Sequence, residues 1–393
     1  MISRGPDTHR GIRTSESDAF LVCMCSAYGM QLESVRSIFY SDPTFAVHNK
    51  RVLTDTRGTL FSCLTVIPAK IELPIGCVPV VGIAGVATRP EYRGRGYAST
   101  LLSLTTEMAA NTYGAPIALL YAEQPSLYLR NNWVPITRRT VQAVVRGRAT
   151  PLVGQDNGDP HQCLIANLSD EPKRLKDVAT YYRGRSKQKL GSFTRDQARW
   201  ALIAGFIPNR RLVLCYTHME ELAGYAIVDT GIDGNTLPSV LEIDFSDDES
   251  FRCLNAFVAR SFPRIVKAAI NDSREHAFTT VGQVQNGGIL MAQITDVALA
   301  LEWLSKCARS MTTSTPLELT VVTANGTVYT RRMGDASAKR STVLNLSQTE
   351  FAELLFASRP RRSDEPLEPD ELERAEFDWF KRFSIPMSPV DAF

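Results

Sequence analysis

Residues 82–98 read GIAGVATRPEYRGRGYA, and this stretch decides the fold of the first part of the chain. Small and β-branched residues lead through Arg89 and Pro90 into a turn that contains Gly94 and Gly96. Residues 98–112 then place apolar side chains at the i, i+3, i+4, i+7 spacing of an amphipathic helix. The stretch therefore predicts a strand, a tight glycine turn and a helix, which is typical of an α/β fold.

The turn over residues 93–98 is a candidate phosphate site. Glycines let the backbone approach a ligand without a Cβ atom in the way, and the free N–H groups at the start of the helix favour an anion. Arg93 and Arg95 add positive charge. A plain strand–helix turn with solvated arginines is the alternative. The strand before the turn, the helix after it and an apolar strand at residues 117–122 favour the phosphate site.

These residues resemble the GNAT acetyltransferase superfamily, whose turn has the pattern Arg/Gln-x-x-Gly-x-Gly/Ala. The resemblance implies acetyl-CoA as co-substrate, no metal, and a strand before the turn that splays away from its neighbour. Pantetheine would contact Val86, Ala87 and Thr88 on that strand. The pyrophosphate would be held by the turn residues Arg93, Gly94, Arg95, Gly96, Tyr97 and Ala98.

A candidate general acid follows in LYLRNNW, residues 127–133. GNAT enzymes commonly have Tyr-x-x-x-Gly-aromatic here, which implies that Tyr128 is the acid, with Asn132 in place of the glycine. Asn also tolerates the left-handed conformation. A phenol of pKa ~10 stays protonated at neutral pH and can protonate a thiolate of pKa ~8.5. Tyr128 could instead be a packing residue, a role that suits Tyr121 and Trp133 better; these two could also line the acceptor pocket.

Three units are expected along the chain, at residues 1–150, 161–285 and 286–393, separated first by the polar stretch VGQDNGDP. The second unit repeats strand and helix without a glycine turn, and the third has a hairpin signal at Asn325-Gly326. Length and order resemble the Eis (enhanced intracellular survival) acetyltransferases. The resemblance implies an α+β protein with tandem GNAT-like mixed sheets, the second degenerate, followed by a sterol-carrier-like domain, and a homo-oligomer built from trimers.

The Eis resemblance also gives the last residue a role. In that family the terminal carboxylate reaches the active site, so Phe393 would orient a cationic acceptor or relay a proton. A tail docked only for stability is the alternative. Eis enzymes usually have an acidic residue just before the end, whereas this chain has Ala392 there and Asp391 one step earlier.

The expected acceptor is a small cationic amine, by resemblance an aminoglycoside or kasugamycin-type aminocyclitol antibiotic, which makes the protein a resistance enzyme. Protein lysine or N-terminal acetylation, and coenzyme-A binding without chemistry, are the alternatives. Candidate acceptor contacts are Asp18, Glu33, Asp42, Tyr121 and Glu123, although each carboxylate alone could be a solvated surface group.

Composition excludes several classes of protein. The net charge of +2 provides no basic field for nucleic acid or an anionic membrane. No apolar run reaches the ~18–20 residues of a membrane span, and residues 19–30 are read as a core helix because Glu16 and Asp18 adjoin them. The eight cysteines form no CxxC pair and no zinc-ligand spacing with histidine, which indicates reduced thiols in a cytoplasmic protein.

Overall fold

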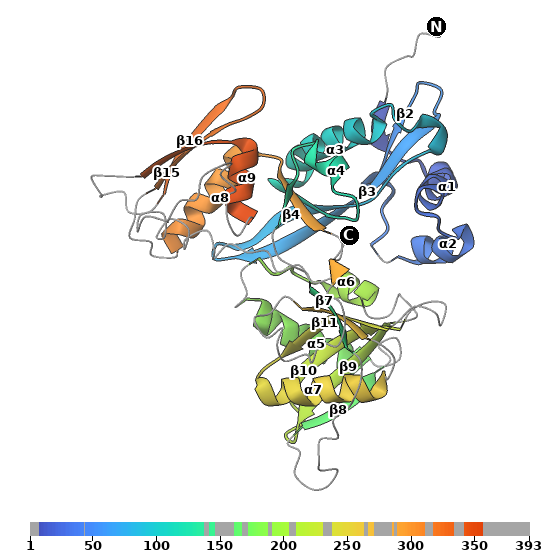
Figure 1. Cartoon of the computed structure of the whole chain (residues 1–393), viewed down its shortest axis with the longest axis vertical. Coiled ribbons are helices and arrows are strands. Elements are labelled where there is room, and N and C mark those ends of the chain that lie inside the picture. The colour runs from blue at the N-terminus through green and yellow to red at the C-terminus, as the bar shows by residue number, and fades with distance from the viewer. Residues whose placement is uncertain are drawn as a thin grey trace.

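The structure is a computed structural model of the chain. It describes residues 8–42, 44–136, 141–145, 161–166, 172–187, 191–203, 210–230, 238–262, 266–270, 285–286, 289–310, 317–333 and 342–356. The described strands form two seven-stranded sheets and one three-stranded sheet. Figure 1 shows the three-stranded sheet beside the first sheet and the second seven-stranded sheet beneath it.

The first sheet has the strand order β1-β2-β3-β4-β5-β14-β6. Helices cover both of its faces (Figure 1). The strands are β1 (Thr8–Gly11), β2 (Lys50–Thr54), β3 (Leu60–Leu73), β4 (Gly76–Thr88), β5 (Ile117–Ala122), β6 (Val134–Pro135) and β14 (Ile289–Ile294). The helices are α1 (Ser17–Tyr28), α2 (Leu32–Ser41), α3 (Tyr97–Tyr113) and α4 (Ser126–Leu129).

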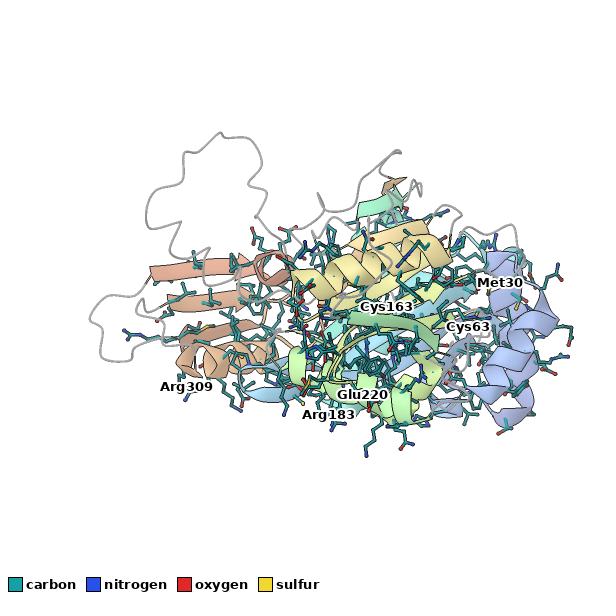
Figure 2. All side chains as sticks on the ribbon, turned by 90° about the horizontal axis from the view of Figure 1, so that it is seen from below. Met30, Cys63, Cys163, Arg183, Glu220 and Arg309 are labelled. Atoms are coloured by element: carbon teal, nitrogen blue, oxygen red, sulfur yellow. The ribbon has the colours of Figure 1, made fainter. Side chains whose placement is uncertain are left out.

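Alternation along β3 separates the two faces of this sheet. Leu64 packs with Leu101 of α3, whereas Cys63 packs with Phe20 of α1. Cys63 is fully buried, and Met30, just beyond α1, is 39% exposed (Figure 2). The predicted strand, turn and helix of the opening stretch are confirmed, because β4 ends at Thr88 and α3 begins at Tyr97.

The second sheet has the order β13-β7-β12-β11-β10-β9-β8. β9 and β10 form a hairpin in this sheet, with Glu220 at φ 59° in the turn between them (Figure 2). Its strands are β7 (Val141–Val145), β8 (His161–Ala166), β9 (Arg210–Thr217), β10 (Leu222–Asp229), β11 (Ser239–Phe245), β12 (Val266–Ile270) and β13 (Gln285–Asn286). Its helices are α5 (Pro172–Ser186), α6 (Gln197–Ala201) and α7 (Asp248–Ser261).

The third sheet has the order β16-β15-β17, with β15 (Leu317–Val322), β16 (Val328–Met333) and β17 (Thr342–Ser347). It packs with α8 (Val297–Ser310) and α9 (Gln348–Phe356) in a core that also includes β3, β4 and β5 residues. The predicted hairpin is confirmed, with Gly326 at φ 83° in its turn. Ser347 and Glu350 form a capping box at the start of α9, each side chain accepting a hydrogen bond from the other's backbone N–H.

Strand pairing crosses the expected unit boundaries. β14 lies in the expected third unit, yet it pairs with β5 along its whole length, from Ile289↔Ala122 to Ile294↔Ile117. β7 lies in the expected first unit, yet it pairs with β12 of the second sheet. The expected division into units at residues 150, 161 and 286 therefore stays a prediction. The first sheet takes β14 from the expected third unit, and the second sheet takes β7 from the expected first unit.

Within the described residues, no helix is long and apolar enough to cross a membrane. The tail that ends at Phe393 lies outside the described residues.

Candidate functional site

The two central parallel strands of the first sheet separate partway along their length. β4 pairs with β5 only from Val81↔Ala118 to Ile83↔Leu120, although β4 continues to Thr88. Residues 84–88 consequently have no partner on β5 in the described sheet, so their backbone groups on that side are not paired with that strand. This separation of β4 from β5, beyond Ile83, is called the split below.

A bulge in β4 accompanies the split. The register against β3 passes from Thr65↔Ala84 to Cys63↔Ala87, so β4 has one extra residue there. Gly85 lies in the bulge at φ 60°, a conformation that favours glycine. A Cβ atom at Gly85 would also lie 3.1 Å from the sulfur of Met24. The glycine thus lets α1 pack closely against the strand where it bends away.

Side chains bind the carbonyl oxygens at the end of β4. The hydroxyl of Ser62 on β3 donates to the oxygen of Ala87 at 2.7 Å. Carbonyls alternate in direction along a strand, so the oxygens of Val86 and Thr88 point to the other side, into the split. Val86 accepts from the Tyr28 hydroxyl at 3.1 Å and Thr88 accepts from Arg93 Nε at 3.2 Å.

The glycine turn forms an open cradle at the end of the same strand. Gly94 and Gly96 have φ of 74° and 81°, and no atom lies within 4 Å of the position where a Cβ would stand. The first N–H groups of α3 have no intrahelical partner and point toward this space. The ring of Tyr97 is buried and stacked on Phe61, with 4.6 Å between centroids, which fixes the start of the helix. These residues fit an anionic diphosphate.

Tyr128 stands on α4, next to the split. Its ring is half-buried and meets Trp133 edge to face, with centroids 6.2 Å apart. Its hydroxyl makes no hydrogen bond with any residue in the described part of the chain. Burial, and then the electrostatic effect of nearby Tyr28, raise the pKa of Tyr128 to about 12. The phenol is therefore protonated at neutral pH and has a donor available for a ligand.

The turn after α4 holds Tyr128 in place. Asn132 has φ 61°, so the position that favours glycine in the family pattern is left-handed here too. The Asn131 amide donates to Ser99 Oγ at 3.0 Å and so ties the turn to α3. Gln293 of β14 donates to the backbone oxygen of Asn131 at 3.0 Å. Both a neighbouring helix and a strand from far along the chain thus fix the position of α4.

Comparison with known families supports what this geometry indicates. Residues 8–136 match the family model described as an acetyltransferase (GNAT) domain. This part of the chain is a GNAT acetyltransferase domain. The chain therefore carries a GNAT-type acetyltransferase domain over these residues, and GNAT enzymes use acetyl-CoA as acyl donor.

Solved structures share the fold beyond the GNAT domain. A GCN5-related N-acetyltransferase from Anabaena variabilis ATCC 29413 is 16% identical, with 90% of this chain and 91% of that chain covered and a TM-score of 0.69. One from Kribbella flavida is 18% identical, with 89% and 88% covered and a TM-score of 0.64. Eis1 from Mycobacterium abscessus is 17% identical, with 90% of each chain covered and a TM-score of 0.60. A comparison with curated protein sequences gives no match.

Two carboxylates expected to bind the acceptor share one arginine. Asp18 lies 3.4 Å from Arg36 and accepts a hydrogen bond from Tyr40 at 3.1 Å. Glu33 lies 2.9 Å from the same Arg36. They therefore join α1 to α2 on the surface of the GNAT domain, and much of their charge is compensated locally.

The other expected acceptor contacts are spread over the domain. Asp42 accepts from the N–H and the hydroxyl of Thr44, both at 2.7 Å, and so closes a turn after α2. Tyr121 lies on β5 opposite Leu290, and Glu123 is exposed just after that strand. Glu123 is close enough to Tyr28 to raise its pKa, after the larger effects of burial and Cys63.

The structure thus places Val86, Tyr28, Glu123 and Tyr128 around one opening. Asp18, Glu33 and Asp42 lie on or after α1 and α2. Phe393 lies outside the described residues.

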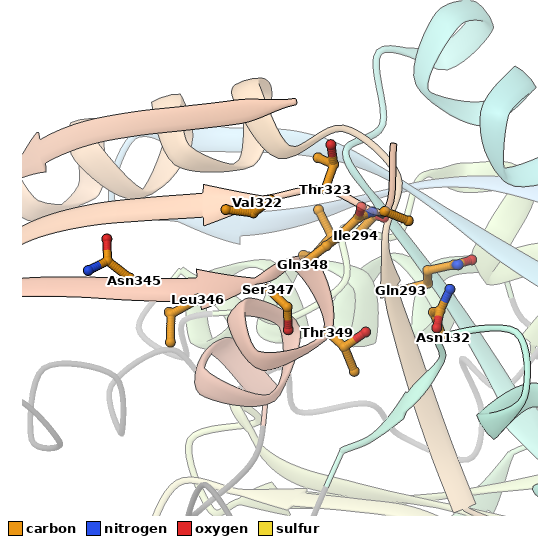
Figure 3. Close-up of a pocket in the computed structure, with 11 residues that line it drawn as sticks. Asn132, Gln293, Ile294, Val322, Thr323, Asn345, Leu346, Ser347, Gln348 and Thr349 are labelled. Carbon is orange, nitrogen blue, oxygen red and sulfur yellow. Dashed lines mark hydrogen bonds between the residues drawn. The ribbon is translucent and has the colours of Figure 1, made fainter. Parts of the chain in front are cut away.

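A cavity of about 470 Å³ adjoins the turn after α4 on its other side (Figure 3). Asn132 and Gln293 line it from the GNAT sheet, and Thr323, Asn345 and Gln348 line it from the third unit. Its described lining includes hydroxyl and amide groups and no charged side chain. Gln348 also donates to the backbone oxygen of Ile294 at 2.7 Å, which joins α9 to β14. The third unit therefore supports the strand that positions α4.

Sequence reasoning missed Tyr28 and Arg36. Tyr28 closes an apolar helix just before Gly29, and an aromatic residue at such a position carries no motif. The role of Arg36 depends on the packing of α1 against α2, which brings Asp18 within 3.4 Å of it. The spacing of Glu33 and Arg36 at i and i+3 on one helix was the available signal.

Proposed function

We propose that this protein transfers the acetyl group of acetyl-CoA directly to the amine of a small acceptor, with Tyr128 as proton donor to the departing sulfur. The observation that carries the proposal is the Tyr128 hydroxyl, which is half-buried beside the split and has no hydrogen-bond partner among the described residues. The open glycine turn at the end of β4 supports the donor half of the proposal.

Binding of the donor follows from the strand and the turn. The turn residues 93–98 would hold the diphosphate, and backbone groups of Val86, Ala87 and Thr88 would pair with the pantetheine arm along the split. Acetyl-CoA supplies the acetyl group as a thioester. Backbone N–H groups in the split polarise the carbonyl toward attack.

The reaction forms a C–N bond between the acceptor nitrogen and the acetyl carbon and breaks the C–S bond. Tyr128 gives its proton to the sulfur, and the nitrogen gives up a proton that restores Tyr128. Full transfer from a phenol of pKa about 12 to a thiolate of pKa ~8.5 costs about 5 kcal/mol. We therefore propose that Tyr128 first donates a hydrogen bond to the sulfur, and that this bond strengthens as negative charge develops there. Transfer of the proton to the sulfur is completed as the nitrogen loses its own proton.

The proposed acceptor is an aminoglycoside or a kasugamycin-type aminocyclitol. The three-unit layout that resembles Eis enzymes supports this, together with the fold shared with Eis1 from Mycobacterium abscessus. Exposed Glu123, beside Tyr28, is suited to attract an ammonium group. The terminal carboxylate of Phe393 is proposed to orient the cation or relay its proton, and a homo-oligomer built from trimers is proposed on the same resemblance.

Free-thiol release with acetyl-CoA tests the proposal on a panel of aminocyclitols, simple amines and lysine peptides. Tyr128→Phe should lower kcat by about 10²-fold or more and leave the Kd for acetyl-CoA within about twofold. Tyr40→Phe, which removes an exposed hydroxyl on α2, is the matched control and should leave kcat unchanged. Unchanged turnover in Tyr128→Phe would remove Tyr128 from the mechanism. Tight acetyl-CoA binding without thiol release from any amine would indicate a binding protein instead.

A further inference from the structure

A second cavity lies beside β3 and β4 of the GNAT sheet; it opens on the face that carries α1 and α2 and reaches the C-terminal end of α3 at Tyr113. It has a volume of about 680 Å³ and is bounded by β3, β4, the segment after α2, and residues 193–202 near α6. Lys50 of β2, Thr65 of β3 and Asp42 are among its lining residues. Lys50 identifies the face, because its ammonium lies against Phe39 of α2, which belongs to the same core as Phe20 of α1.

Lys50 is a buried cation without a counterion. The residue is 8% exposed, and its Nζ lies 5.0 Å and 5.6 Å from the ring centroids of Phe39 and Phe45. Across the described residues, no carboxylate and no hydrogen-bond acceptor lies within bonding distance of it. Burial lowers the pKa of Lys50, an effect that the more distant Asp42 opposes. Burying an ammonium without an anion is costly, and the two rings offset only part of this cost, so an anionic ligand at this position would be favoured.

Asp42 does not supply the missing partner. One of its oxygens already accepts both hydrogen bonds from Thr44. Asn49, next to Lys50, accepts from the Tyr113 hydroxyl through Oδ1, which leaves its amide N–H groups as donors in the same cavity wall. Lys70 and Arg199 add positive charge to the lining, and Asp196 adds a negative charge. The cavity therefore combines several donors with a buried positive charge.

The strand register places this cavity relative to the split. Lys50 pairs with Thr65, and Thr65 pairs with Ala84, the first residue of the split. Directly opposed residues on antiparallel strands point to the same face. Two strand spacings separate the backbones of Lys50 and Ala84, a distance of about 10 Å. A molecule of modest size on this face can span both places.

We propose that the cavity binds an anionic group, a carboxylate or a phosphate, of the acceptor itself, with Lys50 as the cation that holds it. The proposal rests on the proposed function and narrows it: the acceptor has a primary amine for the split and an acidic group about 10 Å away. Among aminocyclitols, those that carry an acid would be preferred over purely cationic ones. Lys50 is a specificity residue and takes no part in the chemical step.

Matched acceptors test this assignment. The probes are 6-aminohexanoate, 6-aminohexyl phosphate and 6-amino-1-hexanol, which share one amine and one chain and differ in the far group. The wild type should acetylate at least one of the two anionic probes with a kcat/KM about tenfold or more above the alcohol. Lys50→Met should bring all three within about twofold, and Lys50→Arg should keep the preference. Lys176→Met, at an exposed position of α5 outside the cavity lining, is the control and should keep the preference for the anionic probes.

Calorimetric titration of the same probes separates binding from turnover. An anionic probe that binds more tightly than the alcohol, and loses this advantage in Lys50→Met, supports the site even without thiol release; the missing thiol release would then count against the proposed function alone. Equal binding of all three probes, no binding of any, or an anion preference that persists in Lys50→Met would each overturn the proposal. The relative preference for the carboxylate or the phosphate probe identifies the anion.

Discussion

The hydroxyl of Tyr28 donates a 3.1 Å hydrogen bond to the backbone oxygen of Val86, and so joins the end of α1 to the part of β4 that has left β5. Val86 O would otherwise face the split without a protein donor. The two residues are 58 positions apart in the sequence, and their hydrogen bond holds the end of β4 beside the split, where acetyl-CoA is proposed to bind.

Tyr28→Phe should therefore affect stability more than donor binding. The bond is exposed, so we expect a loss of about 0.5–1 kcal/mol in the free energy of unfolding by urea. A carbonyl oxygen accepts two hydrogen bonds, so the Kd for acetyl-CoA should change less than about twofold. A large loss of acetyl-CoA affinity at unchanged stability would show that Tyr28 acts on the donor and not on α1.

The left-handed backbone at Asn132 makes a second prediction. Asn132→Gly should keep stability and activity near wild type, because glycine adopts φ 61° without strain. Asn132→Ala should cost about 1 kcal/mol and lower kcat, since the turn that positions Tyr128 becomes strained. Urea unfolding and thiol release on the two variants provide the comparison. Equal behaviour of the glycine and alanine variants would mean that the turn relaxes freely.

The raised pKa of Tyr128 leads to a prediction for the basic side of the pH–rate profile. The protonated phenol is the active form, and a pKa raised to about 12 moves its loss to higher pH than for a free tyrosine. With saturating acceptor, kcat should not decline up to about pH 10. The profile of the residual activity in Tyr128→Phe serves as reference. A decline centred below pH 10 that disappears in Tyr128→Phe would contradict the raised pKa.

The lowered pKa of His9 predicts that the free energy of unfolding decreases in acid. Burial and then Arg51 lower its pKa to about 4, and Arg51 Nε donates to His9 Nε2, which requires the neutral ring. Because the pKa of His9 is lower in the folded protein than in the unfolded chain, where it is about 6.5, this residue favours the folded state above pH 6.5. The contribution is at most about 3 kcal/mol, and it is lost as the pH falls from 6.5 toward 4. Urea unfolding from pH 7.5 to 4 should show the slope in wild type and a smaller one in His9→Gln. His48→Gln, at an exposed site, should keep the wild-type slope.

Arg36 tests the two acidic residues on α1 and α2. Since Asp18 and Glu33 share Arg36, Asp18→Asn should change the KM of a polycationic acceptor by less than about twofold. Arg36→Gln frees both carboxylates and should lower that KM about two- to fivefold, with the effect shrinking in high salt. A tenfold rise of KM in Asp18→Asn would instead place Asp18 in contact with the acceptor.

Local patterns carried much of the fold. The turn at Gly94 and Gly96, the helix after it and the strand at residues 117–122 lie where their spacing predicts, because turn chemistry and periodicity act over a few residues. Pairings between distant strands leave no such pattern, so the place of β14 between β5 and β6 could not be predicted. The split was expected only through the family resemblance, and the pairing of β4 with β5 now locates its start at Ile83.

The candidate site divides in the same way. Tyr128 and the turn were found because each belongs to a short motif. The role of Lys50 could not be predicted from the sequence. Its burial and its lack of a carboxylate partner among the described residues depend on which groups fold around it. Asp18 and Glu33 were predicted from their charge and from their place in the first two helices, and their pairing with Arg36 appears only when α1 and α2 pack together.

The position of β14 in the first sheet also affects when that sheet can be completed during synthesis. During synthesis, β5 emerges long before residues 289–294 exist, so one edge of β5 stays without its partner while the whole second sheet is made. An apolar strand edge left open in this way invites pairing with another nascent chain. The sheet of the GNAT domain is thus completed only after residues 289–294 are made, and a fragment cut after residue 136 would lack this partner of β5.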